Sequence, residues 1–333
     1  MVIDDNFYMR LALDAAWPYQ GLTFPNPAVG CVILDANGRL LAKAAHQKAG
    51  EAHAELRAVM QALQLLNPTL DFPKTASEQH AFVCEHHQNL LQNATVYVTL
   101  EPCNHYGSTP PCALLLQTLH VKRVVIGMLD PNVKASGGKE RLKKAGIEVV
   151  SGVLEDACHD LLEPFIVWQQ RSFSFFKLGM SNNGVIDGGV VTSNASRTFV
   201  HRLRDKTDLL VIGGNTVRED RPTLDARLCN GRAPDVLIYS HHQSFDAEIP
   251  LFAIGSRKVM IESTFASLEN YRFVMIEGGF GMSHALPQNT TWYLLFHSPH
   301  FKEGKALHVN KSLRLLWQGR CGEDSYGWYK EVR

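Results

Sequence analysis

The stretch GEAHAEL (residues 50–56) places His53 and Glu55 two positions apart where a helical pattern begins. Apolar residues then recur with the period of an α-helix, which predicts a helix over residues 54–66. In mid-helix, side chains two residues apart diverge by about 200° and could not serve one site. At the mouth of a helix, both can lean toward its positive end, where the helix dipole favours a bound anion such as hydroxide.

A second stretch, TLEPCNHYGSTPPCALLL (residues 99–116), supplies two thiols. Cys103 follows a predicted strand and a proline, and Cys112 opens a predicted helix after two further prolines. One histidine and two thiolates leave the fourth position of a tetrahedral zinc ion for water, which is the pattern of a catalytic site. We therefore predict His53, Cys103 and Cys112 as zinc ligands, with Glu55 beside the water as general acid/base.

This set of residues is typical of zinc deaminases, in which H-x-E is combined with P-C-x-x-C and activated water attacks an amino-bearing ring carbon. Here eight residues rather than two separate Cys103 from Cys112. An isolated H-x-E is common by chance at the start of a surface helix. The additional EPC and the proline pair argue against that simpler interpretation.

The residues around these motifs predict alternating strands and helices. The predicted helices and strands follow in chain order: a helix over 5–17, strands over 28–35 and 40–46, the helix over 54–66, a strand over 94–100, a helix over 112–119, a strand over 123–128, and a helix then a strand over 139–150. Helices placed between strands indicate an α/β sheet with parallel pairs. This first domain is predicted to span residues 1–150.

Residues 69–93 interrupt the pattern with a polar segment that has little period, and we predict a surface loop inserted in the first domain. The segment contains four potential ligands, His80, Cys84, His86 and His87. Their spacing matches no common zinc module, so a solvated loop is favoured over a second metal site.

A linker over residues 151–171, with a predicted helix, separates the first domain from a second α/β domain over 172–333. Six buried strands are predicted in the second domain, over 175–181, 208–214, 235–240, 258–263, 272–279 and 291–297. LLVIGGNTVREDRPTL (209–224) and FVMIEGGFGM (273–282) each lead a strand into glycines, which let a backbone approach a phosphate near a helix start. Neither reads G-x-G-x-x-G, so nucleotide binding and simple tight packing both remain open.

The composition limits the class of protein. The chain has 333 residues, a formal net charge of zero and 45% hydrophobic residues, which fits a globular protein without a broad nucleic-acid-binding surface. The N-terminus carries acids where a secretory signal has bases, and no apolar run approaches the ~20 residues of a membrane span. Seven cysteines, an odd number, argue against a disulfide framework. We expect a cytoplasmic enzyme with no membrane association.

Three segments resemble the deaminase domain of the bifunctional riboflavin-biosynthesis enzymes: FPNPAVGCVI (24–33), HQKAGEAHAE (46–55) and VTLEPCNHYGSTPPC (98–112). The resemblance implies a cytidine-deaminase-like three-layer domain with one zinc ion per chain. It also implies that Asn26 helps to hold the pyrimidine and that His46 and His105 lie on the ribose-phosphate side of the substrate. Ordinary loop residues are the alternative for these three positions.

GGNTVREDRPTLDAR (213–227) and EGG (277–279) resemble the reductase domain of the same enzymes, which implies a dihydrofolate-reductase-like fold and NADPH as hydride donor. The residues implied to line the cofactor are Met180, Thr216, Asp220, Ser240 and Glu277. Those implied to hold the phosphoribosyl substrate are Lys177, Arg204, Leu224 and Arg227, where guanidinium groups suit a phosphate. A solvated helix face is the alternative for Arg204.

The reductase segment departs from the family pattern at two places. The usual S-L-D-G is replaced by residues 181–184, which read S-N-N-G. The usual tryptophan that follows is replaced by Val190 or Val191, and this loss bears on how the nicotinamide end of a cofactor is covered.

The resemblance implies two consecutive reactions. The first is hydrolytic deamination of 2,5-diamino-6-(5-phosphoribosylamino)pyrimidin-4(3H)-one, and the second is NADPH-dependent reduction of the ribosyl group of 5-amino-6-(5-phosphoribosylamino)uracil to ribityl. A homo-oligomer, a dimer or a tetramer, is expected. The alternatives are a nucleoside or nucleic-acid deaminase with a non-catalytic accessory domain, and a structural zinc protein. Neutral charge disfavours a nucleic-acid substrate, and a structural zinc site would not need Glu55.

Overall fold

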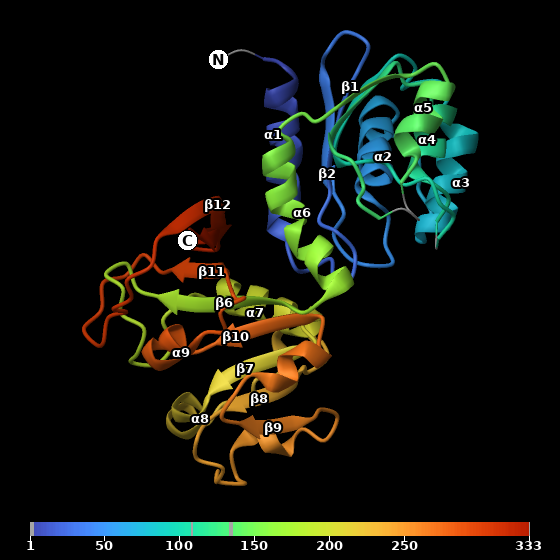
Figure 1. Ribbon diagram of the computed structural model, residues 1–333. Helices are drawn as coiled ribbons and strands as arrows, with labels where there is room; N and C mark the ends of the chain where they lie inside the picture. Colours follow the sequence, from blue (N-terminus) through green and yellow to red (C-terminus); the bar gives the residue numbers. More distant parts are fainter. Residues whose placement is uncertain (1–2, 108, 133–135, 333) are drawn as a thin grey trace. The chain divides into compact units, whose positions relative to one another are not determined.

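The computed structural model describes residues 3–107, 109–132 and 136–332 (Figure 1). The chain divides into two compact units, Met1–Ile166 (unit 1) and Val167–Arg333 (unit 2). The boundary falls inside helix α6 (Glu155–Gln170), which occupies most of the segment predicted as a linker.

Unit 1 is built on a five-stranded sheet in the order β2-β1-β3-β4-β5. Its strands are β1 (Gly30–Leu34), β2 (Leu40–Ala45), β3 (Thr95–Leu100), β4 (Arg123–Met128) and β5 (Glu148–Ser151). The pairs β1–β2 and β1–β3 are antiparallel, whereas β3–β4 and β4–β5 are parallel. All five residues of β1 are buried, as expected for an inner strand covered on both faces.

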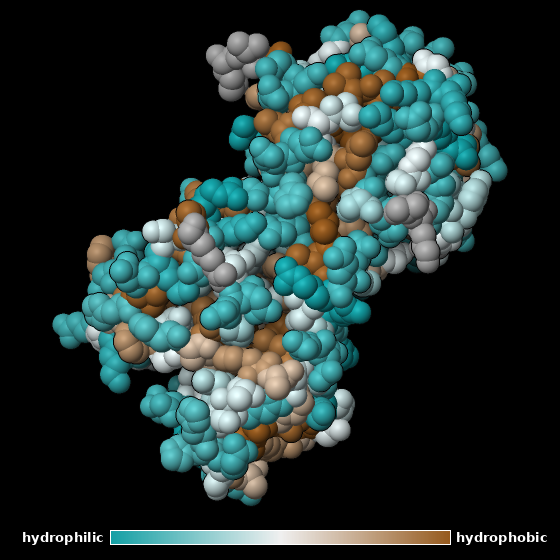
Figure 2. Space-filling view, viewed as in Figure 1, coloured by the Kyte–Doolittle hydropathy of each residue, from teal (hydrophilic) through white to brown (hydrophobic). Residues whose placement is uncertain are grey.

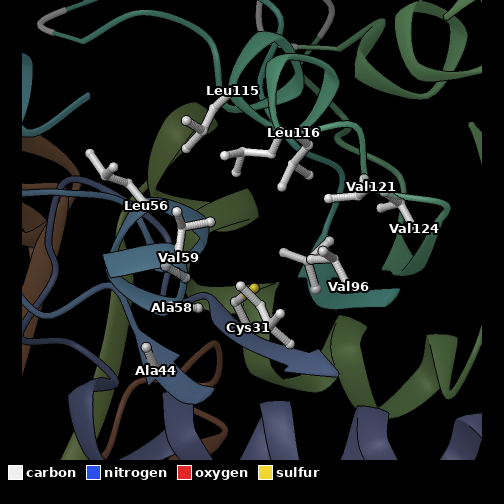
Figure 3. Packing of buried hydrophobic residues seen from close by; sticks show 14 of the residues in the cluster. Cys31, Ala44, Leu56, Ala58, Val59, Val96, Leu115, Leu116, Val121 and Val124 are labelled. Atoms are coloured by element: carbon white, nitrogen blue, oxygen red, sulfur yellow. The ribbon is translucent and has the colours of Figure 1, made fainter. Parts of the chain in front are cut away.

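Helices cover both faces of this sheet and give the three layers that were predicted (Figure 1). The helix α1 (Asp5–Ala16) and the first part of α6 lie on one face. The helices on the other face are α2 (Ala54–Leu66), α3 (Ala76–His86), α4 (Cys112–Thr118) and α5 (Gly138–Lys144). Figure 3 shows the core between the sheet and the layer of α2, α3, α4 and α5. There Val59 and Leu116 of the helices pack with Cys31, Val96 and Val124 of the strands.

The prediction of a surface loop over residues 69–93 is wrong for residues 76–86, which form α3. Thr75 and Glu78 make a reciprocal capping box that begins the helix, with the Thr75 side chain accepting from the backbone of Glu78 and the Glu78 side chain from the backbone of Thr75. The buried face of α3 consists of Ala76, His80 and Val83, which have helical spacing. Because a histidine lies in the middle of that face and a small residue at its start, the sequence does not show the apolar period of a helix there.

Unit 2 contains an eight-stranded sheet in the order β12-β13-β11-β6-β10-β7-β8-β9. Its strands are β6 (Phe173–Met180), β7 (Leu209–Gly213), β8 (Asp235–Tyr239), β9 (Val259–Glu262), β10 (Phe273–Glu277), β11 (Trp292–His297), β12 (Leu313–Cys321) and β13 (Asp324–Glu331). Six neighbouring strands of this sheet run parallel: β11, β6, β10, β7, β8 and β9. They are the six strands predicted in this half, and the prediction is confirmed. The antiparallel hairpin β12–β13 was not predicted.

Three helices of unit 2 bear on its site: α7 (Asn194–Lys206), α8 (Gly214–Asp220) and α9 (Phe280–Ala285). The core at one end of the sheet is an aromatic cluster. The rings of Phe175 and Phe273 are stacked with centroids 5.5 Å apart, and Trp328 meets Phe175 edge-on at 5.2 Å. Trp168 and Trp292 complete the cluster.

Hydrophilic residues cover most of the visible face of each unit, with smaller apolar areas between them (Figure 2). Among the described residues, no helix has both the length and the apolar character that crossing a membrane requires.

Candidate functional site

The three predicted zinc ligands converge in unit 1. His53 is the N-cap residue of α2, Cys103 lies in the loop after β3, and Cys112 is the first residue of α4. The His53 Nδ1 atom lies 3.8 Å from Cys103 Sγ and 3.5 Å from Cys112 Sγ. Zinc–sulfur and zinc–nitrogen bonds of about 2.3 and 2.0 Å in a tetrahedron place ligand atoms roughly 3.5–3.8 Å apart. The two measured distances match these values, and all three atoms lie within 4.8 Å of one another, so the group can hold a zinc ion.

Local structure explains why the two thiols meet. Two prolines directly precede α4, and α4 begins beside the Cys103 loop: the backbone N–H of Ala113 donates to the carbonyl oxygen of Cys103 over 3.2 Å, and that of Cys112 donates to Cys103 Sγ over 3.4 Å. The hydrogen bond with Cys112 lowers the pKa of Cys103, against the effect of burial, and the His53 ring lowers it further. A thiolate is the form of cysteine that binds zinc.

Glu55 lies in the first turn of α2 and is only 4% exposed. Burial raises the pKa of Glu55 to about 7, and the negative charge of Cys103 acts in the same direction. A carboxyl group with a pKa near neutral can both accept and deliver a proton at physiological pH. This is the property that a proton shuttle beside a zinc-bound water requires.

A cavity of about 290 Å³ is lined by residues of the proposed zinc site and by the three predicted substrate-binding residues of unit 1. Its lining contains Asn26, His46 and His105 together with Glu55 and Cys103. The cavity is large enough for a pyrimidine ring close to Glu55. Whether the three residues contact substrate stays a prediction.

His46 fixes the orientation of Asn26. The His46 Nδ1 atom lies 3.1 Å from the carbonyl oxygen of Ala52, and its Nε2 atom lies 3.2 Å from Asn26 Nδ2. Burial lowers the pKa of His46 to about 4, so the ring is neutral at physiological pH. A neutral ring that donates from Nδ1 accepts at Nε2, and Asn26 must then direct its amide N–H toward His46.

Sequence reasoning missed two acidic residues in the lining of this cavity, Glu101 and Asp130. Glu101 is 6% exposed and accepts hydrogen bonds from three backbone N–H groups, those of Asp130 at 3.2 Å, Gly137 at 3.1 Å and Lys139 at 2.8 Å. The side chain thereby ties the segment after β4 to the loop that carries Cys103. Its position two residues before Cys103 was the only sequence signal.

In unit 2, predicted substrate and cofactor residues meet near the carboxyl ends of parallel strands, the edge where such sheets bind ligands. Lys177 of β6 is paired in register with Glu277, the last residue of β10. The Arg204 guanidinium, from α7, reaches both carboxylate oxygens of Glu277 at 3.0 and 2.9 Å. Burial alone would raise the pKa of Glu277, but the positive charges of Arg204 and Lys177 outweigh it and hold that pKa at about 2.

The side chain of Arg204 is 12% exposed, so the alternative of a solvated helix face is wrong for this residue. Its Nη1 atom also donates to the carbonyl oxygen of Asp225 over 3.3 Å. The predicted phosphate-binding role of Arg204 stays a prediction, since Glu277 already engages the guanidinium.

The loop with the predicted substrate residues Leu224 and Arg227 is bound by two arginines. Arg204 bonds its Asp225 carbonyl oxygen, and Arg257 bonds it at two further carbonyl oxygens. Buried Arg257 donates to the carbonyl oxygens of Thr223 at 2.6 Å and of Leu224 at 2.7 Å. Leu224 has a left-handed backbone with a φ of 55°, which the two hydrogen bonds from Arg257 help to maintain. Arg227 is exposed and pairs with Asp225 over 2.9 Å.

The remaining predicted cofactor residues lie on the same edge of the sheet or on α8. Buried Met180 ends β6 and buried Ser240 follows β8. Thr216 lies in α8, and Asp220 is the exposed last residue of that helix. These four residues therefore lie at strand ends or on α8. Their contacts with a cofactor stay predictions.

Comparison with known proteins agrees with both halves of the chain. The profile of the "Cytidine and deoxycytidylate deaminase zinc-binding region" family matches residues 2–128, and that of the "RibD C-terminal domain" family matches residues 179–289. The riboflavin biosynthesis protein RibD of Synechocystis is 34% identical over 285 residues, which are 80% of this chain and 70% of that protein. RibD of Mycobacterium tuberculosis is 36% identical, over 81% of this chain and 77% of that protein.

A solved structure also matches nearly the whole chain. The diaminohydroxyphosphoribosylaminopyrimidine deaminase/5-amino-6-(5-phosphoribosylamino)uracil reductase of Thermotoga maritima is 25% identical, with a TM-score of 0.66, and the match covers 98% of this chain and 99% of that one. Matches to both a deaminase and a RibD-type second domain disfavour the alternative of a nucleoside or nucleic-acid deaminase with a non-catalytic accessory domain. The chain therefore belongs to the RibD family of riboflavin-biosynthesis proteins, which combine a deaminase with a reductase.

Proposed function

We propose that unit 1 deaminates 2,5-diamino-6-(5-phosphoribosylamino)pyrimidin-4(3H)-one by hydrolysis, with His53, Cys103 and Cys112 as zinc ligands. The observation that carries the proposal is the approach of His53 Nδ1 to both thiols, next to the buried carboxyl of Glu55. When bound, zinc lowers the pKa of water so that a nucleophile exists near neutral pH.

Glu55 moves the protons of this reaction. One of its carboxylate oxygens accepts the first proton that the attacking water loses, and the carboxyl group delivers it to the ring nitrogen. The carboxylate then takes the second proton from the hydroxyl group of the adduct and delivers it to the departing amine. The attack forms a carbon–oxygen bond at the amino-bearing ring carbon, and ammonia leaves as that carbon–nitrogen bond breaks. Asn26, held by His46, orients the pyrimidine, and His105 contacts the ribose-phosphate side.

Unit 2 is proposed to reduce the ribosyl group of the deaminated product to ribityl with NADPH. A bound NADPH supplies hydride, and the protein's task is to place the sugar carbon against it. Lys177 lies beside Glu277 at the strand ends, where its ammonium can donate a proton to the sugar oxygen as the carbonyl is reduced. Arg204, Leu224 and Arg227 hold the phosphoribosyl group, and Met180, Thr216, Asp220, Ser240 and Glu277 line the cofactor site.

The proposal extends to the organisation of the protein. The deaminase domain spans residues 1–150 with 69–93 inserted, and the reductase domain spans 172–333 after the linker. The protein works in the cytoplasm as a homo-oligomer.

A two-stage assay of the purified, zinc-loaded protein tests the two activities. The diamino substrate without NADPH is expected to release one ammonia per substrate molecule, and addition of NADPH is then expected to give one oxidised NADPH per ammonia. Turnover of cytidine or RNA but not of the diamino substrate would contradict the deaminase proposal. Ammonia release without NADPH oxidation would contradict the reductase proposal alone.

A further inference from the structure

Two segments of unit 2 continue past the ends of neighbouring strands, at the edge where the proposed reductase site lies. Residues 181–190 follow β6, and residues 298–307 follow β11, which pairs parallel with β6 (Figure 1). The first segment contains the S-N-N-G sequence and begins directly after Met180. It has also lost the tryptophan of the family pattern, so it needs other contacts to keep its place beside a ligand.

Asn183 supplies two of these contacts. Its Nδ2 atom donates to the carbonyl oxygen of Lys302 over 2.8 Å, and its Oδ1 atom accepts from the backbone N–H of the same residue over 3.0 Å. Ser181 Oγ also donates to Asn183 Oδ1 over 2.7 Å. An amide can pair with both backbone groups at once, whereas the ionised aspartate of the family pattern has no donor for the carbonyl oxygen. Through Asn183 the S-N-N-G sequence therefore joins the two segments.

Further hydrogen bonds extend this attachment along both segments. The backbone N–H of Asn182 donates to the carbonyl oxygen of His300 over 2.8 Å, and that of Ile186 donates to the carbonyl oxygen of Lys305 over 3.1 Å. The backbone N–H of Lys305 donates to Asp187 Oδ1 over 2.9 Å. The two segments are therefore one paired unit and not two separate loops.

The paired segments reach the proposed cofactor site at two points. The Lys302 ammonium donates to the carbonyl oxygen of Val190 over 2.9 Å, at or next to the position of the lost tryptophan. Ile186 lies against Gly279, because a Cβ atom added to that glycine would be 3.4 Å from Ile186 Cδ1. Gly279 belongs to the glycines after β10, which let a backbone approach a cofactor. Asn183 is thus connected through Lys302 to the segment that borders this site.

We propose that Asn183 is a positioning residue of the reductase site, which holds residues 181–190 in place for the nicotinamide half of the dinucleotide. The inference rests on the proposed reductase function. Asn183 acts through Lys302 and Val190 and does not itself touch the cofactor. Because the segment is ordered before the ligand arrives, less entropy is lost on binding, and the nicotinamide half binds more tightly.

Two ligands that differ in the nicotinamide half test the proposal without turnover. The full-length protein is titrated calorimetrically with NADPH and with 2′,5′-ADP, which keeps the adenine half and lacks the nicotinamide half. Asn183→Asp replaces the amide donor by a carboxylate that repels the Lys302 carbonyl oxygen, so NADPH binding is expected to weaken about threefold to tenfold. Asn183 is exposed, so the core stays intact, and 2′,5′-ADP binding should change by less than about twofold.

Asn182→Asp is the matched control. It adds the same charge one residue away, on another exposed side chain, and keeps the backbone hydrogen bond to His300. Both affinities should stay at their wild-type values. In the ligand-free protein, hydrogen exchange of the amides in residues 298–307 should be faster in Asn183→Asp than in Asn182→Asp.

Lys302→Met tests the connection to Val190. The substitution removes the ammonium that holds the Val190 carbonyl oxygen but keeps the backbone groups that Asn183 binds. NADPH binding should weaken as it does in Asn183→Asp. The double variant should lose little more than either single variant, since both substitutions break one connection.

Three results would overturn the role of Asn183. They are equal weakening of NADPH and 2′,5′-ADP in Asn183→Asp, equal weakening of NADPH in Asn183→Asp and Asn182→Asp, and wild-type affinity for NADPH in Asn183→Asp. If the wild-type protein still oxidises NADPH with the deaminated intermediate, each of these results leaves the proposed reduction standing. A wild-type protein that neither binds nor oxidises NADPH would reject the reductase proposal, and the role of Asn183 with it.

Discussion

Burial distinguishes Glu55 from an ordinary helix-start glutamate. Its pKa of about 7 lies near the working pH, because burial disfavours the carboxylate and the neighbouring Cys103 thiolate adds to this effect. Glu55→Gln keeps the size of the side chain but cannot accept the proton of water. We expect ammonia release to fall by about 10²–10⁴-fold while zinc content, measured by atomic absorption, stays at one ion per chain. A variant with normal zinc and the wild-type rate would remove Glu55 from the mechanism.

Glu277 links the stability of unit 2 to pH. Its pKa in the folded protein is about 2, below its ordinary value of 4.5, because of the charges of Arg204 and Lys177. A carboxyl group with a lowered pKa contributes its full stabilisation above pH 4.5, and that contribution is lost as the pH falls from 4.5 toward 2. We expect the melting temperature of unit 2, followed by circular dichroism, to decline across this window.

Glu277→Gln tests the origin of that decline. The substitution leaves buried Arg204 without its carboxylate, so we expect a loss of about 3–5 kcal/mol at neutral pH and a flatter pH dependence below 4.5. Exposed Glu303→Gln serves as the control. A variant that keeps the wild-type slope would assign the acid sensitivity to other groups.

The sequence predicted that His53, Cys103 and Cys112 come together, because few residue types bind zinc and because prolines and a helix start mark where they lie. Glu101 was not predictable in the same way. A carboxylate that accepts from the backbone N–H groups of Asp130, Gly137 and Lys139 depends on where the chain folds, and those amides carry no side-chain signature. Arg257 bonds backbone carbonyls and was missed for the same reason.

At the scale of elements, the packing of α1 on β1 depends on one missing side chain. A Cβ atom at Gly30 would collide with the carbonyl oxygen of Ala12, which is helix backbone and cannot turn aside. Gly30→Ala should therefore lower the free energy of unfolding of unit 1 by about 1–3 kcal/mol or more. Urea denaturation measures the loss. Gly255→Ala in unit 2, where an added Cβ meets nothing within 4 Å, should change little.

The elements that were predicted have strong periodicity, and those that were missed do not. The helix predicted over 54–66 matches α2, whose buried face is apolar apart from Glu55. In α3 the burial of His80 breaks the apolar pattern. Strand β12 lies at the edge of its sheet with no residue buried, so it lacks a hydrophobic face and is defined by its pairing with β13.

At the scale of the whole molecule, each unit has its own sheet and its own core. The three proposed zinc ligands all lie in unit 1. Removal of zinc with a strong chelator should abolish ammonia release and leave NADPH oxidation with the deaminated intermediate within twofold of the untreated protein. Adding Zn²⁺ back should restore deamination. Parallel loss of both activities would show that the two units depend on each other.

The uneven distribution of tryptophans and cysteines between the two units gives the protein two internal reporters, tryptophan fluorescence and thiol reactivity. Four of the five tryptophans, Trp168, Trp292, Trp317 and Trp328, belong to unit 2, whereas five of the seven cysteines belong to unit 1. Intrinsic fluorescence therefore follows mainly the loss of structure in the reductase half, and the rate of thiol alkylation follows mainly that in the deaminase half. One denaturation series read by both signals gives the order in which the two halves unfold.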